Sequence, residues 1–418
     1  MNNIIEVQKI FTPSSPAIQN FVERETSVNN QITDALRTTG KQIVVYGHSG
    51  SGKTTLISNK LKQIYENHIT VRCMKTSTYD TIILQAFDEL NPYYEETKST
   101  KSSQNKQFKL SADYKLIKTE ISSLKIDENS NVLKRCIPPA LTMQTLARFL
   151  GNAKCCLVLE DFHKIPNDQK TYISQTMKLF MDMSEEYEEL KIICIGAVDT
   201  GREVIEYDKE MSNRVSEILI PLMTDNEIRS IIVNGFNKLN INIPEKITNQ
   251  IIKFSNGVPS ICHEICLKLC FAKELYTTAE KNEILKDEDL KKAINNYIKD
   301  SSDTIKSEFD KALEQKRKRT YNNNELILKV LSTFNISGAS YSDILKKIQE
   351  KEPKYPQSNL TKYLGFLTTA EYGELVVKRL SNYTFKSPIY LTYAQLIFKE
   401  EKQTVNLASL LQELFRIK

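Results

Sequence analysis

The chain has 418 residues, which is enough for two or three domains with buried cores, so its stability does not require disulfides or a structural metal. Its 8 cysteines include no CxxC pair and are typical of reduced thiols, and a net charge of +5 is too small to indicate nucleic-acid binding by itself. The amino terminus lacks a basic region followed by an apolar run, and no later stretch approaches the length of a membrane span. We therefore expect a cytoplasmic protein that does not associate with a membrane.

The first half of the chain predicts strands that alternate with helices. Residues 41–46 (KQIVVY) indicate a buried strand, because four of the six residues are β-branched or aromatic and a glycine follows. The other strands are expected at 69–73, 155–159 and 192–195, and the helices at 27–36, 54–65 and 79–90. Short apolar strands that alternate with helices indicate a parallel sheet with helices on both faces.

The second half of the chain predicts a different organisation. A segment rich in Lys, Ser, Thr and Glu at about 92–132 interrupts the first pattern and is typical of an insertion. The pattern from 225 to about 298 is entirely helical. From 324 onward, three helices (325–334, 341–349, 358–367) and two strands (375–380, 383–385) predict a winged helix.

A phosphate-binding loop follows the first predicted strand. Gly47 to Thr54 match G-x-x-x-x-G-K-[ST] in full, between a strand and a helix, and this context argues against a glycine-rich turn that matches by chance. The glycines let consecutive N–H groups turn toward a phosphate, Lys53 would reach the outer phosphates, and the Thr54 hydroxyl would bind Mg²⁺. The residues expected to bind nucleotide here are Gly47, His48, Ser49, Gly50, Ser51, Gly52, Lys53, Thr54 and Thr55.

An acidic pair ends a buried strand that we expect to neighbour the first one. Glu160 would hold Mg²⁺ through water, together with Thr54, and Asp161 would polarise the attacking water. The alternative is an acidic pair at a strand end that only faces solvent. The next strand ends near Asp199 and Thr200, where a polar side chain could sense the terminal phosphate.

The order of these features resembles the AAA+ and STAND branch of the P-loop ATPases over most of residues 20–300. The resemblance rests on FVERE (21–25), the phosphate loop, LEDFH (159–163), IICIGAVDT (192–200), Arg214 before SEILIPL, and Gly257-Val258-Pro259. It implies an α/β fold: a parallel-sheet P-loop NTPase core, a helical lid and a C-terminal winged-helix domain. It also implies ATP hydrolysis with ATP and Mg²⁺.

The resemblance also implies roles for three further residues. FVERE is similar to the family box F-x-G-R-x-x-E near the base, which places Arg24 among the nucleotide-binding residues, although Glu23 replaces the family's glycine and leaves adenine selectivity in doubt. Arg214 stands where AAA+ relatives carry an arginine that reaches a neighbour's nucleotide, which implies a homo-oligomer; an ordinary surface arginine is the alternative. Pro259 belongs to a Gly-x-Pro that STAND proteins carry in place of a sensor arginine, and a plain helix-start turn is the alternative.

The winged helix resembles the one appended to origin-recognition ATPases and to STAND proteins. Its basic side chains are sparse (Lys362, Lys378, Arg379, Lys386), which favours a protein-binding or autoinhibitory module over a DNA reader. The run Lys316 to Arg319 is typical of a solvated linker. The expected domains are 1–222 (core), 223–300 (lid), 301–323 (linker) and 324–418 (winged helix).

Three functions remain open at this level. The first is a regulatory ATPase that switches conformation or oligomeric state to control a separate effector protein, with antiviral defence as one setting suggested by family analogy. The alternative is an origin-recognition-like DNA-binding ATPase or loader. A small-molecule kinase or ABC-type ATPase comes last, because the chain has no LSGGQ-like stretch and a kinase does not need a helical lid with a winged helix.

Overall fold

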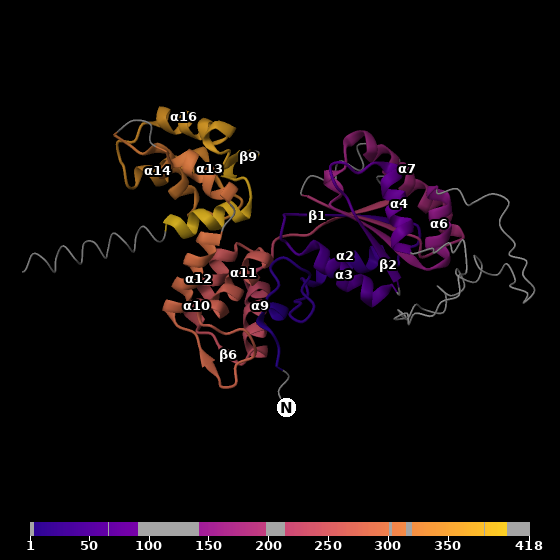
Figure 1. The fold of residues 1–418 in the computed structure, drawn as a ribbon. Helices are drawn as coiled ribbons and strands as arrows, with labels where there is room; N and C mark the ends of the chain where they lie inside the picture. Colours follow the sequence, from indigo (N-terminus) through magenta and orange to yellow (C-terminus); the bar gives the residue numbers. More distant parts are fainter. Residues whose placement is uncertain are drawn as a thin grey trace, which may run out of the picture. The chain divides into compact units, whose positions relative to one another are not determined.

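The computed structural model describes residues 4–65, 67–90, 142–197, 214–300, 303–314, 320–379 and 381–398 (Figure 1). They form two compact units. The sheet unit is Glu23–Pro221, and the helical unit combines Met1–Val22 with Leu222–Lys418. The predicted insertion at 92–132 lies outside the described residues.

The sheet unit is built on five parallel strands in the order β2-β3-β4-β1-β5. The strands are β1 (Gln42–Tyr46), β2 (Asn67–Arg72), β3 (Cys155–Glu160), β4 (Ile192–Gly196) and β5 (Val215–Leu219). The four predicted strands are confirmed with small shifts of their ends. The prediction that β3 neighbours β1 is wrong, because β4 pairs with both and lies between them.

Helices cover both faces of this sheet (Figure 1). They are α2 (Thr26–Arg37), α3 (Lys53–Ile64), α4 (Tyr79–Leu90), α6 (Met143–Asn152) and α7 (Asn167–Asp182), with short 3₁₀ turns at η1 (Phe162–Lys164) and η2 (Met183–Glu185). Strands β3 and β4 are buried along almost their whole length, which is what a parallel sheet covered on both faces requires. All strands run the same way, so their carboxyl ends share one edge.

Lys191 closes the opposite, amino edge of the sheet. It directly precedes β4 and is only 1% exposed. Its ammonium group donates to the carbonyl of Lys41 at 3.0 Å and to that of Thr38, and both carbonyls precede β1. Burial lowers the pKa of Lys191 to about 8, although Cys156 raises it. The amine therefore ties the turn before β1 to the start of β4.

The predicted lid is mostly helical. Its helices are α9 (Asp225–Lys238), α10 (Glu245–Ser255), α11 (Pro259–Ala272) and α12 (Asp287–Asp300). Thr224 and Glu227 begin α9 with a reciprocal capping box. The prediction of an entirely helical region is wrong in one detail, because β6 (Ile241–Asn242) and β7 (Glu283–Ile284) pair in parallel. Two-residue strands are too short to produce an alternating pattern in the sequence.

The first described residues belong to the helical unit, which corrects the predicted core boundary at residue 1. Helix α1 (Val7–Ile10) and Phe11 are buried in the core of the lid. The Val7 amide donates to the carbonyl of Tyr276 at 3.0 Å, and the Thr12 amide donates to Nδ1 of His263 at 3.1 Å. The lid therefore needs an apolar segment that precedes the sheet in sequence, and no local pattern indicates such a long-range pairing.

The C-terminal elements have a hydrophobic core of their own. They are α13 (Asp303–Leu313), α14 (Asn323–Leu331), β8 (Ala339–Ser340), α15 (Tyr341–Gln349), α16 (Gln357–Leu367), η4 (Ala370–Tyr372), β9 (Val376–Arg379), β10 (Asn382–Phe385) and a helical segment at 388–398. The strands form an antiparallel sheet in the order β8-β10-β9. Three helices followed by two strands are confirmed, and the winged-helix interpretation stays a prediction.

Helix α13 corrects the predicted linker at 301–323. Phe309 on this helix is 1% exposed, and its ring lies 4.9 Å from that of Tyr393 and 6.3 Å from that of Phe385. These aromatic contacts make α13 part of the C-terminal core rather than a solvated tether. The basic run Lys316 to Arg319 lies outside the described residues. No helix in the described ranges is long and apolar enough to cross a bilayer.

Candidate functional site

The phosphate loop joins β1 to α3 at the carboxyl edge of the sheet. Gly50 and Gly52 have φ values of 75° and 87°, in the left-handed region that glycine adopts at least cost. A backbone that alternates between left-handed and right-handed conformations turns successive N–H groups toward one point and forms an anion-binding concavity. Gly52 is also the N-cap of α3, so the positive end of this helix faces the same loop.

Lys53 lies inside this loop, at the first position of α3. Its ammonium group donates to the carbonyls of Gly47 at 2.9 Å and His48 at 2.7 Å. Burial lowers the pKa of Lys53 to about 8, and the negative charge of Asp161 raises it. A partly buried ammonium whose closest partners are neutral carbonyls gains from an anion brought beside it.

Two further features concern the packing of the loop. Ser51 is fully buried, and its Oγ has no hydrogen-bond partner among the residues that the structure describes. A Cβ on Gly47 would lie 2.5 Å from the carbonyl oxygen of Ile220, so no larger residue fits there without movement. The loop is therefore packed against the end of β5, and the Ile220 amide donates to the Tyr46 carbonyl at 2.8 Å.

The acidic pair lies at the same edge, at the end of β3. Asp161 has a φ of 56°, an uncommon conformation for a residue other than glycine, and directs the chain into η1. Its carboxylate accepts a hydrogen bond from the Lys164 ammonium at 2.6 Å, and its charge acts on Lys53. Lys53 and Asp161 therefore follow the carboxyl ends of β1 and β3, the two strands that flank β4.

Glu160 has a partner that the sequence did not indicate. Arg72, the last residue of β2, stands in register with Glu160, and its Nε lies 3.4 Å from Oε2 of that carboxylate. The Glu160 side chain is 16% exposed and the Arg72 side chain 85% exposed. An arginine at the end of an edge strand is ordinary in a sequence, and only the strand register reveals the pair.

The sequence predicts only two protein ligands for Mg²⁺. Among the described ranges, no group of three or more His, Cys, Asp or Glu side chains is arranged to hold a metal. Thr54 on the first turn of α3 and Glu160 remain as two oxygen ligands. Mg²⁺ at nucleotide sites typically takes one or two protein ligands, with phosphates and waters completing its shell, so the donor set fits.

Arg24 lies beside the loop rather than in it. The residue is 5% exposed, and its Nη2 donates to the carbonyl of Pro221 at 2.5 Å. Pro221 follows Ile220, whose carbonyl faces Gly47. Arg24 therefore supports the segment against which the phosphate loop packs, and a direct contact with nucleotide stays a prediction.

Within the sheet unit, the predicted Arg214 lies apart from this cluster. Arg214 directly precedes β5 and is exposed, so it lies at the amino edge, opposite the phosphate loop. An arginine there cannot serve the loop of its own chain, and its action on a neighbour's nucleotide stays a prediction. Pro259 begins α11 in the helical unit, and its role at the nucleotide stays a prediction too. Asp199 and Thr200 lie outside the described residues.

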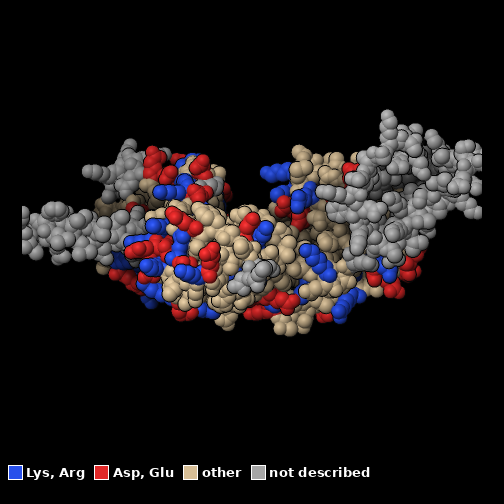
Figure 2. Space-filling view, turned by 60° about the horizontal axis from the view of Figure 1, so that its bottom comes forward, with Lys and Arg blue, Asp and Glu red and all other residues tan. Residues whose placement is uncertain are grey.

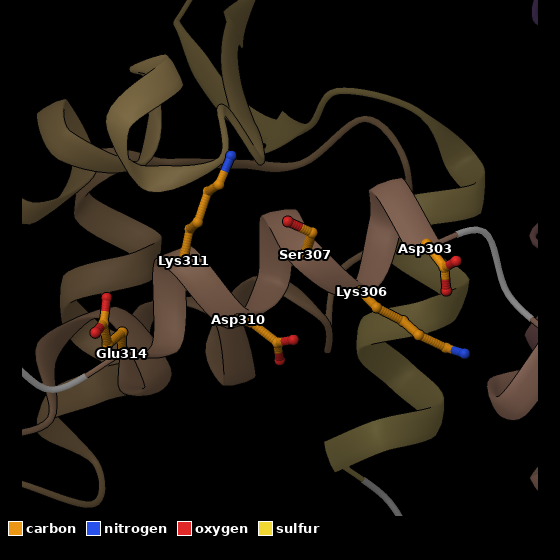
Figure 3. Close-up of a pocket in the computed structure, with 6 residues that line it drawn as sticks. All are labelled: Asp303, Lys306, Ser307, Asp310, Lys311 and Glu314. Carbon is orange, nitrogen blue, oxygen red and sulfur yellow. The ribbon is translucent and has the colours of Figure 1, made fainter.

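A shallow depression of about 490 Å³ on α13 is unrelated to this site (Figure 3). The lining side chains share one face of the helix and carry both signs of charge: Asp303, Lys306, Ser307, Asp310, Lys311 and Glu314. Figure 3 shows that these side chains do not converge on a common point. The pattern is typical of a solvated helix face.

Comparisons with known proteins agree with this geometry. A family model described as an ATPase domain predominantly from Archaea matches residues 21–265. No curated protein matches the chain. Among solved structures, the Walker-type ATPase of Pyrococcus abyssi is similar with a TM-score of 0.54 and 14% identity, over 92% of this chain and 99% of that one. The Aeropyrum pernix ORC2 protein gives a TM-score of 0.48 at 10% identity, over 96% and 100% of the two chains.

The solved structures and the family model support different conclusions. At 14% identity, the Pyrococcus abyssi structure supports the fold alone, and the Aeropyrum pernix structure, with a TM-score of 0.48, supports no conclusion. The family model spans more than half of the chain and includes the phosphate loop, β3 with its acidic pair, and α9 and α10. The chain therefore belongs to the family of P-loop ATPase domains found predominantly in Archaea.

Proposed function

We propose that the protein is a regulatory ATPase of the AAA+ or STAND type, which binds ATP with Mg²⁺, hydrolyses it slowly and changes conformation to control a partner protein. The observation that carries the proposal is the loop between β1 and α3, in which Gly50 and Gly52 have positive φ and the Lys53 ammonium lies against the carbonyls of Gly47 and His48. The family membership supports ATP hydrolysis.

In this mechanism, loop amides and the Lys53 ammonium bind the phosphates, and Lys53 exchanges its two carbonyl partners for phosphate oxygens. Thr54 and Glu160 would hold Mg²⁺, which would neutralise phosphate charge. The Asp161 carboxylate accepts a proton from, or orients, the water that attacks the outer phosphate. The Lys164 ammonium, 2.6 Å from that carboxylate, holds it in place by an ion pair.

The regulatory part of the proposal rests on the two-unit organisation. The chain passes between the units at residues 22–23 and again at 221–222. The second passage begins at Ile220 and Pro221, which contact Gly47 and Arg24 within the sheet unit. A loop that moves when it binds phosphate thus acts on the segment that leads to the lid. Homo-oligomerisation through Arg214 and a separate effector belong to the same proposal.

Calorimetric titration of Mg-ATP tests the central claim. Wild-type protein is expected to bind, whereas Asp161→Asn is expected to bind with similar affinity and to lose hydrolysis, because a neutral amide cannot take the proton. Equal ATP affinity of wild type and Lys53→Ala would show that the site is misassigned. Equal hydrolysis by wild type and Asp161→Asn would remove Asp161 from the mechanism.

An origin-recognition-like DNA-binding ATPase is the second candidate. Residues 320–398 carry nine Lys and Arg against six Asp and Glu, and Lys362 on α16 and Lys378 on β9 are exposed. Against it, the face drawn in Figure 2 mixes Lys and Arg with Asp and Glu and presents no continuous basic surface. Affinity for unrelated duplex DNA that falls steeply with salt, and that Lys362→Ala weakens, would favour this candidate. A response that does not depend on ionic strength would exclude it.

A further inference from the structure

A sharp corner joins α10 to α11 in the lid. Asn256, the C-cap of α10, has a φ of 47°, and Gly257 follows with a φ of 72°. Asparagine and glycine are the residues that adopt this left-handed region most readily. Val258 then caps α11, which begins at Pro259. The corner is therefore fixed in shape by its own sequence.

The backbone of this corner meets the segment by which the chain enters the helical unit. The Met223 amide donates to the Gly257 carbonyl at 2.7 Å. A Cβ on Gly257 would lie 2.6 Å from the Met223 carbonyl oxygen, so the two backbones are in direct contact. Met223 comes two residues after Pro221, the last residue of the sheet unit. The entering segment is thus hydrogen-bonded to the corner.

The side chain of the same corner bonds to the helical segment at 388–398. Asn256 Nδ2 donates to Thr392 Oγ1 at 2.9 Å and to Gln395 Oε1 at 3.0 Å. Thr392 is fully buried, and its hydroxyl donates in turn to the Phe254 carbonyl at 2.7 Å. Gln395 Nε2 also donates to the Ser332 carbonyl at 3.3 Å, at the end of α14. One amide side chain therefore connects the lid to the C-terminal elements.

Apolar packing places the segment 388–398 in two cores at once. Leu396 is buried in the lid core, against which Ile389 also packs. Leu391 and Phe398 are buried in the core of the C-terminal elements. A helix whose faces complete two cores resists separation from either of them, and the polar bonds of Asn256 fix its position along the lid surface.

We propose that Asn256 is the joint that fixes the segment 388–398 to the lid, so that the lid and the C-terminal elements move as one body. When ATP changes the segment that enters at Met223, the displacement then reaches residues 388–398 through the corner. This second step rests on the proposed ATP-driven function, whereas the joint itself does not. The chain thus delivers a nucleotide signal to its C-terminal elements.

Hydrogen exchange of full-length protein tests the joint. Asn256→Gly tolerates the same backbone conformation and removes the amide, so the amides of 388–398 should exchange about tenfold faster or more. Thr392→Val removes the link from the other side and should act in the same direction. Asn240→Gly is the matched control, because Asn240 also has a positive φ of 57° and an amide that donates, to the Ala279 carbonyl at 3.0 Å.

The control should leave 388–398 unchanged and accelerate exchange only near Ala279. Unchanged exchange of 388–398 in both Asn256→Gly and Thr392→Val would overturn the proposal. Equal acceleration there by Asn240→Gly would do so as well, because the effect would then be a general loss of stability. Unaltered exchange in α9 and α12 checks that the helical unit of each variant folds.

Addition of Mg-ATP separates the joint from the proposed function. In wild type, we expect protection to change at residues 47–55, at 222–223 and at 388–398. In Asn256→Gly, the change at 388–398 should be lost while the change at 47–55 persists. A change at 388–398 that persists in the variant would refute transmission through the joint. If protection at 47–55 does not change in wild type, the ATP-dependent function is contradicted. The joint is then tested by the exchange of the variants without ATP alone.

Discussion

Lys53, which is partly buried, and Lys191, which is buried, lie at opposite edges of the same sheet, and their hydrogen-bond partners are alike. Burial lowers the pKa of each to about 8. The ammonium of Lys53 donates to two main-chain carbonyls, and so does that of Lys191. Hydrogen bonding and pKa alone would therefore not tell a binding group from a structural one.

The two lysines differ in the backbone groups and charges that surround each ammonium. Lys53 shares its loop with two glycines of positive φ, the N-terminus of a 12-residue helix and the charge of Asp161. Lys191 is enclosed by the turn before β1, and its side chain is 1% exposed. A buried lysine serves as an anion site only where the backbone around it offers further donors and an opening. Three experiments on the two lysines test this contrast, and a fourth tests the acidic residue at the same edge as Lys53.

The largest expected effect comes from Lys53→Met. The variant loses the charge that reaches the outer phosphates, so Mg-ATP affinity should fall on the order of a hundredfold or more. Calorimetric titration measures it. Lys191→Met, the matched substitution at the other edge, should keep the wild-type affinity within about twofold. Similar losses in the two variants would mean that the amine at the amino edge also contributes to binding.

Lys191→Met should produce the larger loss of stability. It removes the donor from the carbonyls of Thr38 and Lys41, and we expect the free energy of unfolding of the sheet unit to fall by about 2 kcal/mol. Urea unfolding followed by far-ultraviolet circular dichroism measures it. Lys53→Met should cost less, because Lys53 is only partly buried whereas Lys191 is 1% exposed. The opposite order of stabilities would reverse the structural assignment.

The pH dependence of ATP binding should report Lys53. A phosphate beside the ammonium raises the pKa of Lys53 above its value of about 8 in the free protein, so the complex holds a proton that the free protein loses. The protonated Lys53 therefore contributes fully to ATP affinity below pH 8. Above pH 8 the affinity falls, by up to about tenfold per pH unit. Proton uptake at pH 9, from calorimetry in buffers of different ionisation enthalpy, measures it. Lys53→Met should take up no proton; uptake by that variant would assign the effect to another group.

The smallest effect is expected from Arg72→Ala. Arg72 is 85% exposed, and such an ion pair contributes about 1 kcal/mol or less. Its removal frees the Glu160 carboxylate for Mg²⁺, so the Mg²⁺ concentration for half-maximal ATP hydrolysis should fall by about twofold. Arg229→Ala, which removes a surface pair with Glu245 in the helical unit, is the control and should change nothing. A rise in the Mg²⁺ requirement would mean that Arg72 positions Glu160 for the metal.

The fold of the sheet unit follows largely from local patterns. Strands β1, β3 and β4 are short apolar runs because both of their faces are buried, and such runs are visible in the sequence without any partner. The order of the strands is not visible, because pairing joins residues far apart in the chain. The position of β4 between β1 and β3 could therefore not be predicted from composition or spacing.

The helical unit was less predictable for the same reason. Its helices carry their own periodicity and caps, and their approximate bounds follow from these signals. That Val7 and Phe11 complete the lid core, or that Asn256 bonds to Thr392, depends on contacts across more than a hundred residues. The prediction of a linker was wrong at α13, because Phe309 is buried by contacts with Tyr393 and Phe385, which lie far away in the sequence.

By itself, the sequence determined the phosphate loop, the acidic pair and the alternation of strands and helices, because backbone conformation at glycines and burial of strands are properties of a few adjacent residues. The tertiary structure alone decided which charges meet: Asp161 with Lys53, Arg72 with Glu160, and Lys191 with the turn before β1. Electrostatic coupling depends on distance in space, and strand order and register set that distance.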